Sequence, residues 1–198
     1  HVFRQSRHDR LDMVPVVRKR RKGTDFHEHD RKGRRDHPGG MADGPMMLRV
    51  SLPPVVVLIP VLDRPNRVDP VLRSLEATTD APFRCLFLAS QGYGAEHERI
   101  NDRGGELVVV PFVQGPGDYA RKINFGIRIS TEPNIFMAAD DVEFRDGWYT
   151  AACAALDGLP DRCGVVGTQD LGNDRVVAGQ HSTHSLVTRS YVNDFGTI

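Results

Sequence analysis

Long apolar runs are missing from this sequence, and so is any ordered pattern of cysteines. The longest apolar run, Val55–Leu62, is strand-like and far shorter than the roughly 20 residues that a membrane-spanning helix needs. Residues 1–40 lack the apolar stretch of a secretory signal. Cys85, Cys153 and Cys163 show no metal-site spacing or disulfide framework, which is typical of a reducing compartment. The sequence therefore predicts a cytoplasmic protein with no transmembrane segment.

Net charge is absent as well, because 26 Lys and Arg balance 26 Asp and Glu. The balance hides an asymmetry: residues 1–40 hold 12 basic and 6 acidic residues, and residues 41–198 hold 14 and 20. The acidic remainder gives no support for nucleic-acid binding in the folded part. Residues 1–40 have too little apolar periodicity to offset the entropy of ordering. We expect 1–46 to be a disordered basic segment, native or not, and 47–198 to be the folded domain.

From residue 55 onward, short apolar runs alternate with amphipathic ones. Strands are expected at 55–59, 83–89, 107–110, 135–138 and 164–167, and helices at 67–78, 95–101, 119–129 and 148–156. Asp118 is placed to cap the third helix, and residues 180–187 are read as a further strand or a loop. This alternation predicts an α/β fold with a mostly parallel central sheet and right-handed crossovers.

Two adjacent carboxylates, Asp140 and Asp141, follow the strand expected at 135–138. Open α/β sheets bind ligands at the carboxyl ends of their strands. Paired carboxylates there suit Mg²⁺ or Mn²⁺, which can hold a diphosphate. The alternative is that the two residues form a turn or cap the next helix.

Four blocks in order resemble the family-2 type of glycosyltransferase with the GT-A fold. They are Pro-Val-Leu-Asp-Arg-Pro at 60–65, a polar strand end at 89–91, Gly-Asp-Tyr-Ala-Arg-Lys-Ile-Asn-Phe-Gly-Ile at 117–127, and Ala-Asp-Asp-Val…Gly-Trp at 139–148. The resemblance covers about residues 55–191. It implies a GT-A (Rossmann-like) three-layer sandwich.

The resemblance also implies which residues bind the donor. The residues that match nucleotide-sugar-binding positions are Pro60, Val61, Asp63, Arg64, Ser90, Gln91, Arg121, Asn124 and Asp140. The acid that the family usually places at the second strand's end is missing here, where the chain reads Ala-Ser-Gln. Lys122 is interpreted as part of a solvated helix face, and Trp148 as a packing residue.

The family's Asp-x-Asp metal motif aligns with residues 139–141, so its first Asp is Ala. Asp141 is therefore the first expected ligand of Mn²⁺ or Mg²⁺ and Asp140 the second. His184 is either a further ligand or a structural histidine. An inverting transfer needs a carboxylate base, for which Asp170 and Asp194 are the candidates.

The predicted function is metal-dependent, inverting transfer of a sugar from a nucleotide-diphosphate sugar to an unknown acceptor, whether glycan, protein or nucleic-acid base. Alternatives are a non-catalytic or degenerate nucleotide-sugar-binding module, and a nucleotidyltransferase of similar fold. The glycine-free loop at 60–66 argues against the latter. A basic-tailed nucleic-acid binder would depend on residues 1–40 alone. Because the family's enzymes usually extend further, the acceptor region is expected to be incomplete.

Overall fold

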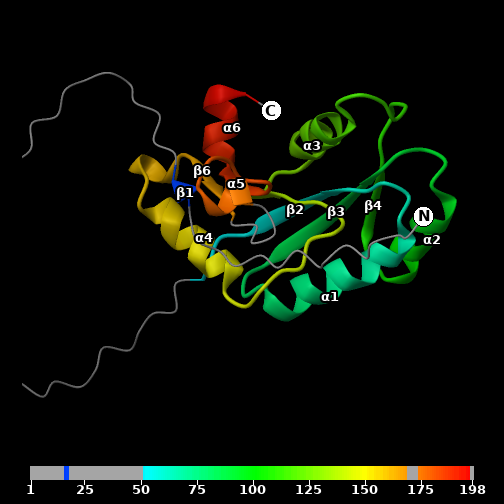
Figure 1. Cartoon of the computed structure of the whole chain (residues 1–198), viewed down its shortest axis with the longest axis horizontal. Helices are drawn as coiled ribbons and strands as arrows, with labels where there is room; N and C mark the ends of the chain where they lie inside the picture. The colour runs from blue at the N-terminus through cyan, green and yellow to red at the C-terminus, as the bar shows by residue number, and fades with distance from the viewer. Residues whose placement is uncertain (1–15, 18–50, 169–173, 197–198) are drawn as a thin grey trace, which may run out of the picture. The chain divides into compact units, whose positions relative to one another are not determined.

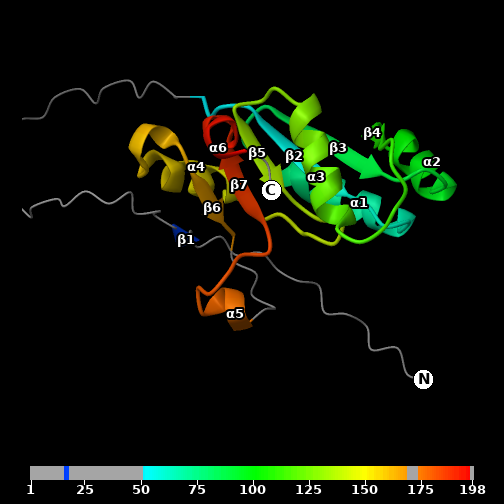
Figure 2. The same ribbon diagram turned by 90° about the horizontal axis from the view of Figure 1, so that it is seen from above.

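The computed structural model describes residues 16–17, 51–168 and 174–196. Its sheet comprises β1 (Val16–Val17), β2 (Val55–Pro60), β3 (Phe83–Ala89), β4 (Glu106–Val109), β5 (Asn134–Met137), β6 (Val165–Gly167) and β7 (Ser185–Thr188), in the order β1-β6-β7-β5-β2-β3-β4. Strands β2 to β5 are parallel, and β7 is antiparallel to both β5 and β6. Five of these strands thus share one direction, and only β7 and the two-residue β1 oppose it. The predicted mostly parallel sheet is confirmed (Figures 1 and 2).

Helices cover both faces of this sheet. They are η1 (Pro65–Arg67), α1 (Val68–Thr78), α2 (Gly94–Asp102), α3 (Asp118–Ile129), α4 (Trp148–Asp157), η2 (Pro160–Arg162), α5 (Asp174–Val177) and α6 (Arg189–Phe195). Figure 1 shows α1 and α4 on one side of the sheet and α3 and α6 on the other. The architecture is the predicted three-layer sandwich.

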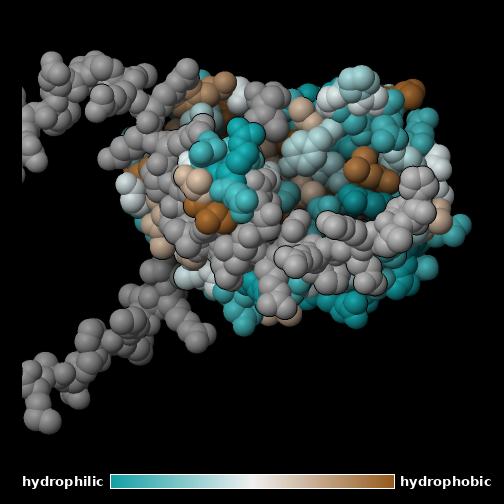
Figure 3. All heavy atoms as spheres, viewed as in Figure 1, coloured by the Kyte–Doolittle hydropathy of each residue, from teal (hydrophilic) through white to brown (hydrophobic). Residues whose placement is uncertain are grey.

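Strand β2 supplies side chains to a separate core on each face. Val57 and Ile59 point into the core shared with α1 and α4, while Val56 and Leu58 point into the core shared with α3. All six residues of β2 are buried, as its continuous β-branched run predicts for a central parallel strand. Where Figure 3 shows the described residues, the surface of this face is mostly hydrophilic with isolated apolar side chains.

Helix α3 approaches the sheet closely because Gly126 lies at the contact. A Cβ atom at this position would meet Leu58 Cδ2 at 2.9 Å and Leu88 Cδ1 at 3.0 Å, closer than carbon atoms normally pack. The missing side chain therefore sets the distance between the helix and strands β2 and β3.

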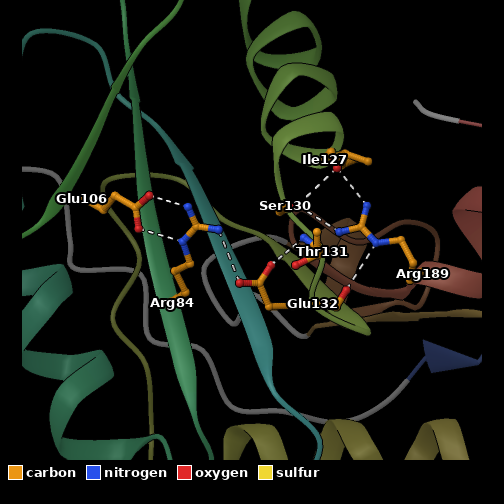
Figure 4. Close-up of polar contacts among 7 residues, drawn as sticks. All are labelled: Arg84, Glu106, Ile127, Ser130, Thr131, Glu132 and Arg189. Carbon is orange, nitrogen blue, oxygen red and sulfur yellow. Dashed lines mark hydrogen bonds and ion pairs between the residues drawn. The ribbon is translucent and has the colours of Figure 1, made fainter.

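Arginine side chains tie the elements together at the edge where the parallel strands begin (Figure 4). Arg189, at the start of α6, donates to the carbonyl oxygen of Ile127 at 2.8 Å and to Ser130 Oγ at 2.9 Å. Arg84 of β3 pairs with Glu106 of β4. These contacts satisfy the carboxyl end of α3 and join neighbouring strands.

Trp148 has the packing role that the sequence predicts. It is 2% exposed, and its ring centroid lies 4.8 Å from that of Phe136 and 4.9 Å from that of Phe144. Its indole Nε1 donates to Thr79 Oγ1 at 3.1 Å. Trp148 therefore anchors α4 against β5 beneath the loop that carries the two aspartates.

Three elements differ from expectation. Residues 180–187 form a strand only from Ser185, and α5 and α6 were not expected at all. Both helices are short, at 4 and 7 residues, which leaves too few turns for an apolar periodicity to stand out in sequence. Among the described residues, no helix is both long enough and apolar enough to cross a membrane.

Candidate functional site

The loops that hold nearly all the predicted site residues meet at one edge of the sheet. Strands β2, β3, β4 and β5 are parallel and therefore end at this edge. Strand β6 ends and β7 begins there too, since Ser185 pairs with both Met137 and Gly167. The ligand edge expected of an open α/β sheet thus carries segments 61–64, 90–93, 110–117 and 138–147.

Arg64 and Asp140 form the centre of this edge. The guanidinium group donates from Nε to Asp140 Oδ2 at 2.9 Å and from Nη2 to Asp140 Oδ1. Its Nη1 lies 3.7 Å from Asp141 Oδ2. The Asp140 side chain is only 2% exposed, whereas those of Arg64 and Asp141 are 37% and 46% exposed. The arrangement is a buried carboxylate held by an arginine, with a second carboxylate open to solvent.

Both aspartates lie in a turn after β5, as one alternative reading of the sequence had it. They do not cap the next helix, because Gly147 occupies the cap position of α4 and no side chain caps it. The turn geometry and the contact with Arg64 therefore coexist.

Glu96, in the first turn of α2, holds the backbone of the loop after β2. Its carboxylate accepts the N–H groups of Asp63 at 2.9 Å and Arg64 at 3.0 Å. Asp63 has a left-handed backbone, with φ of 58°, which is uncommon for a residue other than glycine. Glu96 is completely buried. The loop is thus fixed from both sides, by Glu96 at its backbone and by Asp140 at the Arg64 side chain.

Sequence reasoning missed Glu96, which lies in α2, seven residues after the last residue of β3. The available signal was its position four residues before Ile100. Residues i and i+4 share a helix face, and Ile100 is the apolar residue that α2 buries. A carboxylate on that face must be buried with it and needs donors.

Burial shapes the protonation of both carboxyls. Desolvation raises the pKa of Glu96 above its ordinary value, and the two backbone N–H groups oppose that rise. Desolvation also raises the pKa of Asp140; the Arg64 guanidinium opposes the shift, and the charge of Asp141 adds to it. Both pKa values rise because burial disfavours the charged form of each carboxyl by more than its hydrogen-bond and charge partners favour it.

Lys122 is not on a solvated helix face; that interpretation was wrong. Its side chain is completely buried, and its Nζ lies 2.8 Å from the carbonyl oxygen of Val61 and 2.9 Å from Asp118 Oδ2. Nζ also lies 5.5 Å from the centre of the Tyr93 ring. The helix turns this residue inward because Lys122 shares a face with Gly126, the point of closest packing. A buried lysine is tolerated here because it is paired and hydrogen-bonded.

Asp118 is not the cap of α3 but its first residue. The cap position belongs to Gly117, which has φ of 72° and caps without a side chain. The Asp118 carboxylate instead pairs with Lys122 and with Arg121 at 3.2 Å. Arg121 also donates to the carbonyl oxygen of Val113 at 2.8 Å, so it holds the loop after β4 and remains 42% exposed.

The remaining nucleotide-binding candidates line the same edge. Pro60 and Val61 are buried at the end of β2, and Ser90, 3% exposed, follows β3 next to the exposed Gln91. Asn124 is half-buried in the second turn of α3. The structure thus brings these candidates to the loops around Arg64 and Asp140.

The remaining candidates for the metal ligand and the catalytic base do not lie together: one is at the site edge, one is outside the described residues and one is at the opposite edge of the sheet. His184 directly precedes β7 and so lies at the site edge, where its carbonyl oxygen accepts the N–H of Thr168 at 2.9 Å. Asp170 lies outside the described residues. Asp194 is at the opposite edge: it belongs to α6, which follows β7, and its Oδ2 lies 3.8 Å from the Sγ of Cys163, which precedes β6. Asp194 is therefore not brought to the site.

A hollow of about 550 Å³ lies beside the same loop but holds none of the predicted residues. It is lined by Pro65, Asn66, Asp69, Pro70, Arg73 and Arg99. Within this group, Arg99 donates from Nε to Asp69 Oδ2 at 2.6 Å. This contact joins α1 and α2.

Comparison with known proteins supports the fold. The chain matches no protein-family model and no curated protein. Among solved structures, it superposes on a mannosyltransferase from Pyrobaculum calidifontis, in complex with GDP-mannose and Mn²⁺, with a TM-score of 0.55 and 12% identity. That match covers 75% of this chain and 48% of the other, so this chain spans about half the length of the mannosyltransferase.

Two further solved structures show partial likeness. They are glucosyl-3-phosphoglycerate synthase from Mycobacterium tuberculosis with uridine diphosphate (TM-score 0.40, 15% identity, 50% of this chain and 38% of that one) and residues 1–349 of S. aureus TarS (0.42, 14%, 54% and 32%). Both scores are too low to carry an argument. The match to the mannosyltransferase shows the fold, which is of the GT-A glycosyltransferase type predicted from the sequence.

Proposed function

We propose that this domain binds a nucleotide-diphosphate sugar at the carboxyl edge of its sheet and transfers the sugar to an acceptor. The observation that carries the proposal is the clustering of Arg64, Glu96, Asp140 and Asp141 at that edge, from the loops after β2 and β5 and the first turn of α2. The GT-A fold supports it, because the neighbour in the P. calidifontis structure is itself a mannosyltransferase bound to GDP-mannose.

The loop after β2 would form the nucleoside side of the site. Asp63 offers an exposed carboxylate to ribose hydroxyls, and its backbone is fixed by Glu96 before any ligand arrives. Such preorganisation lowers the entropy cost of binding. Ser90 adds a hydroxyl at the neighbouring strand end, and its Oγ has no hydrogen-bond partner among the described residues. This hydroxyl can donate to a base or ribose oxygen.

The fit of these residues to the predicted Mn²⁺ or Mg²⁺ is poor as they are arranged. Arg64 occupies both oxygens of Asp140, which leaves Asp141 as the open carboxylate, and no group of three His, Cys, Asp or Glu suited to a metal occurs among the described residues. Asp141 could join a metal that the donor's phosphates also hold, as Mg²⁺ sites often do. The metal stays a prediction, and no step of the proposed reaction is derived through it.

The chemical step is nucleophilic displacement at the sugar's anomeric carbon. The acceptor oxygen forms a bond to that carbon, the bond to the diphosphate oxygen breaks, and the acceptor's proton passes to a base. Positive groups near the diphosphate would stabilise the charge that develops on it as it leaves. Of the two base candidates, Asp194 lies at the wrong edge, so Asp170 remains proposed for this role. Inversion, the acceptor and the cytoplasmic location remain predictions.

The test is isothermal titration calorimetry of the full chain, as wild type and as Asp141→Ala, with UDP and GDP in the presence and absence of Mn²⁺. We expect one of the nucleotides to bind wild type, and a transfer assay with the matching nucleotide sugar to release the diphosphate. Binding without transfer to any acceptor or to water would favour the non-catalytic module. If neither nucleotide bound under either condition, the proposed function would be wrong.

A further inference from the structure

We propose that Arg64 is the cation that binds the donor's diphosphate, so that nucleotide binding at this site does not require a divalent metal. The inference rests on the proposed function and deepens it. It follows from the disagreement just described: Asp140, the second expected metal ligand, is instead occupied by an arginine whose outer side is open.

Two anchors, Glu96 and Asp140, fix the position of Arg64. Its backbone N–H is held by Glu96 at 3.0 Å, and its Nε by Asp140 at 2.9 Å. Glu96 is completely buried and the Asp140 side chain is 2% exposed, so neither anchor moves freely. An arginine anchored at both ends presents its planar group in one orientation, which removes most of the cost of ordering a long side chain.

The guanidinium group retains donors for a ligand. It carries five N–H groups, and Asp140 uses one on Nε and one on Nη2. The Nη1 atom makes no hydrogen bond within the described part of the chain and lies 3.7 Å from Asp141 Oδ2, beyond hydrogen-bond reach. With the side chain 37% exposed, this outer edge faces the rim of the site. Two N–H groups on one edge match two phosphate oxygens, the geometry in which arginine binds phosphate best.

The contacts of the neighbouring cations, Lys122 and Arg121, favour Arg64 for this role. Lys122 is completely buried, and its Nζ contacts the carbonyl oxygen of Val61 and the carboxylate of Asp118. Arg121 is committed to Val113 and Asp118. Of these three cations, Arg64 is the one that carboxylates anchor at both its backbone N–H and its side chain, while its Nη1 makes no hydrogen bond within the described part of the chain. Asp140 keeps it in place when no nucleotide is bound.

The experiment titrates the full chain with UDP, GDP, uridine and guanosine, in EDTA and in Mn²⁺. The proteins are wild type, Arg64→Lys, Arg64→Ala, Asp141→Ala and the control Arg128→Ala, which removes an exposed arginine from the far end of α3. Circular dichroism and thermal melting check that each variant folds. Arg64→Lys keeps the charge but not the paired donors, so it serves if Arg64→Ala leaves Asp140 unpaired and unfolds.

We expect wild type to bind one nucleoside diphosphate, UDP or GDP. Its affinity for that ligand in EDTA should be within threefold of its affinity in Mn²⁺. Arg64→Lys should weaken the nucleoside diphosphate at least tenfold and the nucleoside less than twofold, while Arg128→Ala changes neither. General damage to the site would weaken both ligands equally and would contradict the proposal. Binding only with Mn²⁺, retained in Arg64→Lys but lost in Asp141→Ala, would overturn it and leave the proposed function standing. Absence of all nucleotide binding would overturn both.

Discussion

Lys122 Nζ lies 2.8 Å from the carbonyl oxygen of Val61, so a lysine of α3 holds the loop that follows the central strand. The same nitrogen pairs with Asp118, one helical turn earlier, at 2.9 Å. A single buried cation thus connects the start of α3 to the end of β2. Arg64 lies three residues beyond Val61 in the same loop.

Replacing Lys122 should cost far more than replacing its exposed neighbour. Lys122→Met leaves the Val61 carbonyl and the Asp118 carboxylate without their buried partner, and we expect a loss of about 3–5 kcal/mol in the free energy of unfolding. Arg121→Met removes an exposed ion pair with the same aspartate and should cost about 1 kcal/mol or less. Urea denaturation of both variants measures this. Equal losses would show that burial of Lys122 does not matter.

Glu96 should be needed for nucleotide affinity although it is placed beneath the loop. Glu96→Gln replaces one of two acceptors with a donor that faces a backbone N–H, so the loop at 63–64 loosens. We expect a loss of about 1–3 kcal/mol in stability and weaker UDP or GDP binding. Glu98→Gln, on the exposed side of the same helix, is the matched control. Calorimetric titration of both variants with UDP and GDP measures the affinity. An unchanged affinity in Glu96→Gln would contradict the prediction that Glu96 is needed for nucleotide binding.

The contribution of Glu96 to stability should change with pH. Because burial raises its pKa in the folded state, the folded chain holds the proton more tightly than the unfolded chain between about pH 4.5 and the raised value. Stability falls with rising pH wherever the folded state binds more protons. The free energy of unfolding of wild type relative to Glu96→Gln should therefore increase as pH falls from 7 toward 5. A difference that stays constant between pH 7 and pH 5 in urea titrations would exclude the shift.

Gly126 should not tolerate even a methyl group. Gly126→Ala would push Cβ against Leu58 and Leu88 at about 3 Å, and overpacking of this kind costs about 1–3 kcal/mol. Gly94→Ala adds the same atom at the start of α2, where nothing lies within 4 Å, and should not destabilise the fold. Thermal melting of the pair gives the comparison. A Gly126→Ala variant as stable as Gly94→Ala would mean that α3 can shift outward freely.

Asp194→Asn should leave nucleotide binding and sugar transfer within twofold of wild type, because α6 places this residue at the edge opposite the site. The matched comparison is Asp141→Asn, which changes an aspartate at the site edge itself. Initial rates of diphosphate release from the matching nucleotide sugar provide the readout. A large loss in Asp194→Asn would mean that the C-terminal helix reaches the site during turnover.

The sequence by itself determined the layers of this protein and the edge at which its site lies. Continuous β-branched runs such as 55–59 are compatible only with burial on both faces, and alternation with helices makes such strands parallel. Parallel strands end at one edge, so the turn at 140–141 had to fall at the same edge as the loop after β2. These are local patterns, and local patterns can be read along the chain. The pairing of β5 with β2, which brings the two together, was decided by the folded sheet.

The tertiary structure decided what each charged residue does. Lys122, Glu96 and Arg64 are ordinary charged residues in sequence. The helix face that Glu96 shares with Ile100 indicates its burial, but the sequence does not tell which groups Glu96 binds, that Lys122 is buried or that Arg64 stays partly exposed. Their roles depend on partners 61, 33 and 76 residues away. The energy of a charge depends on its burial and its partner, and both exist only once the strands and helices are packed together.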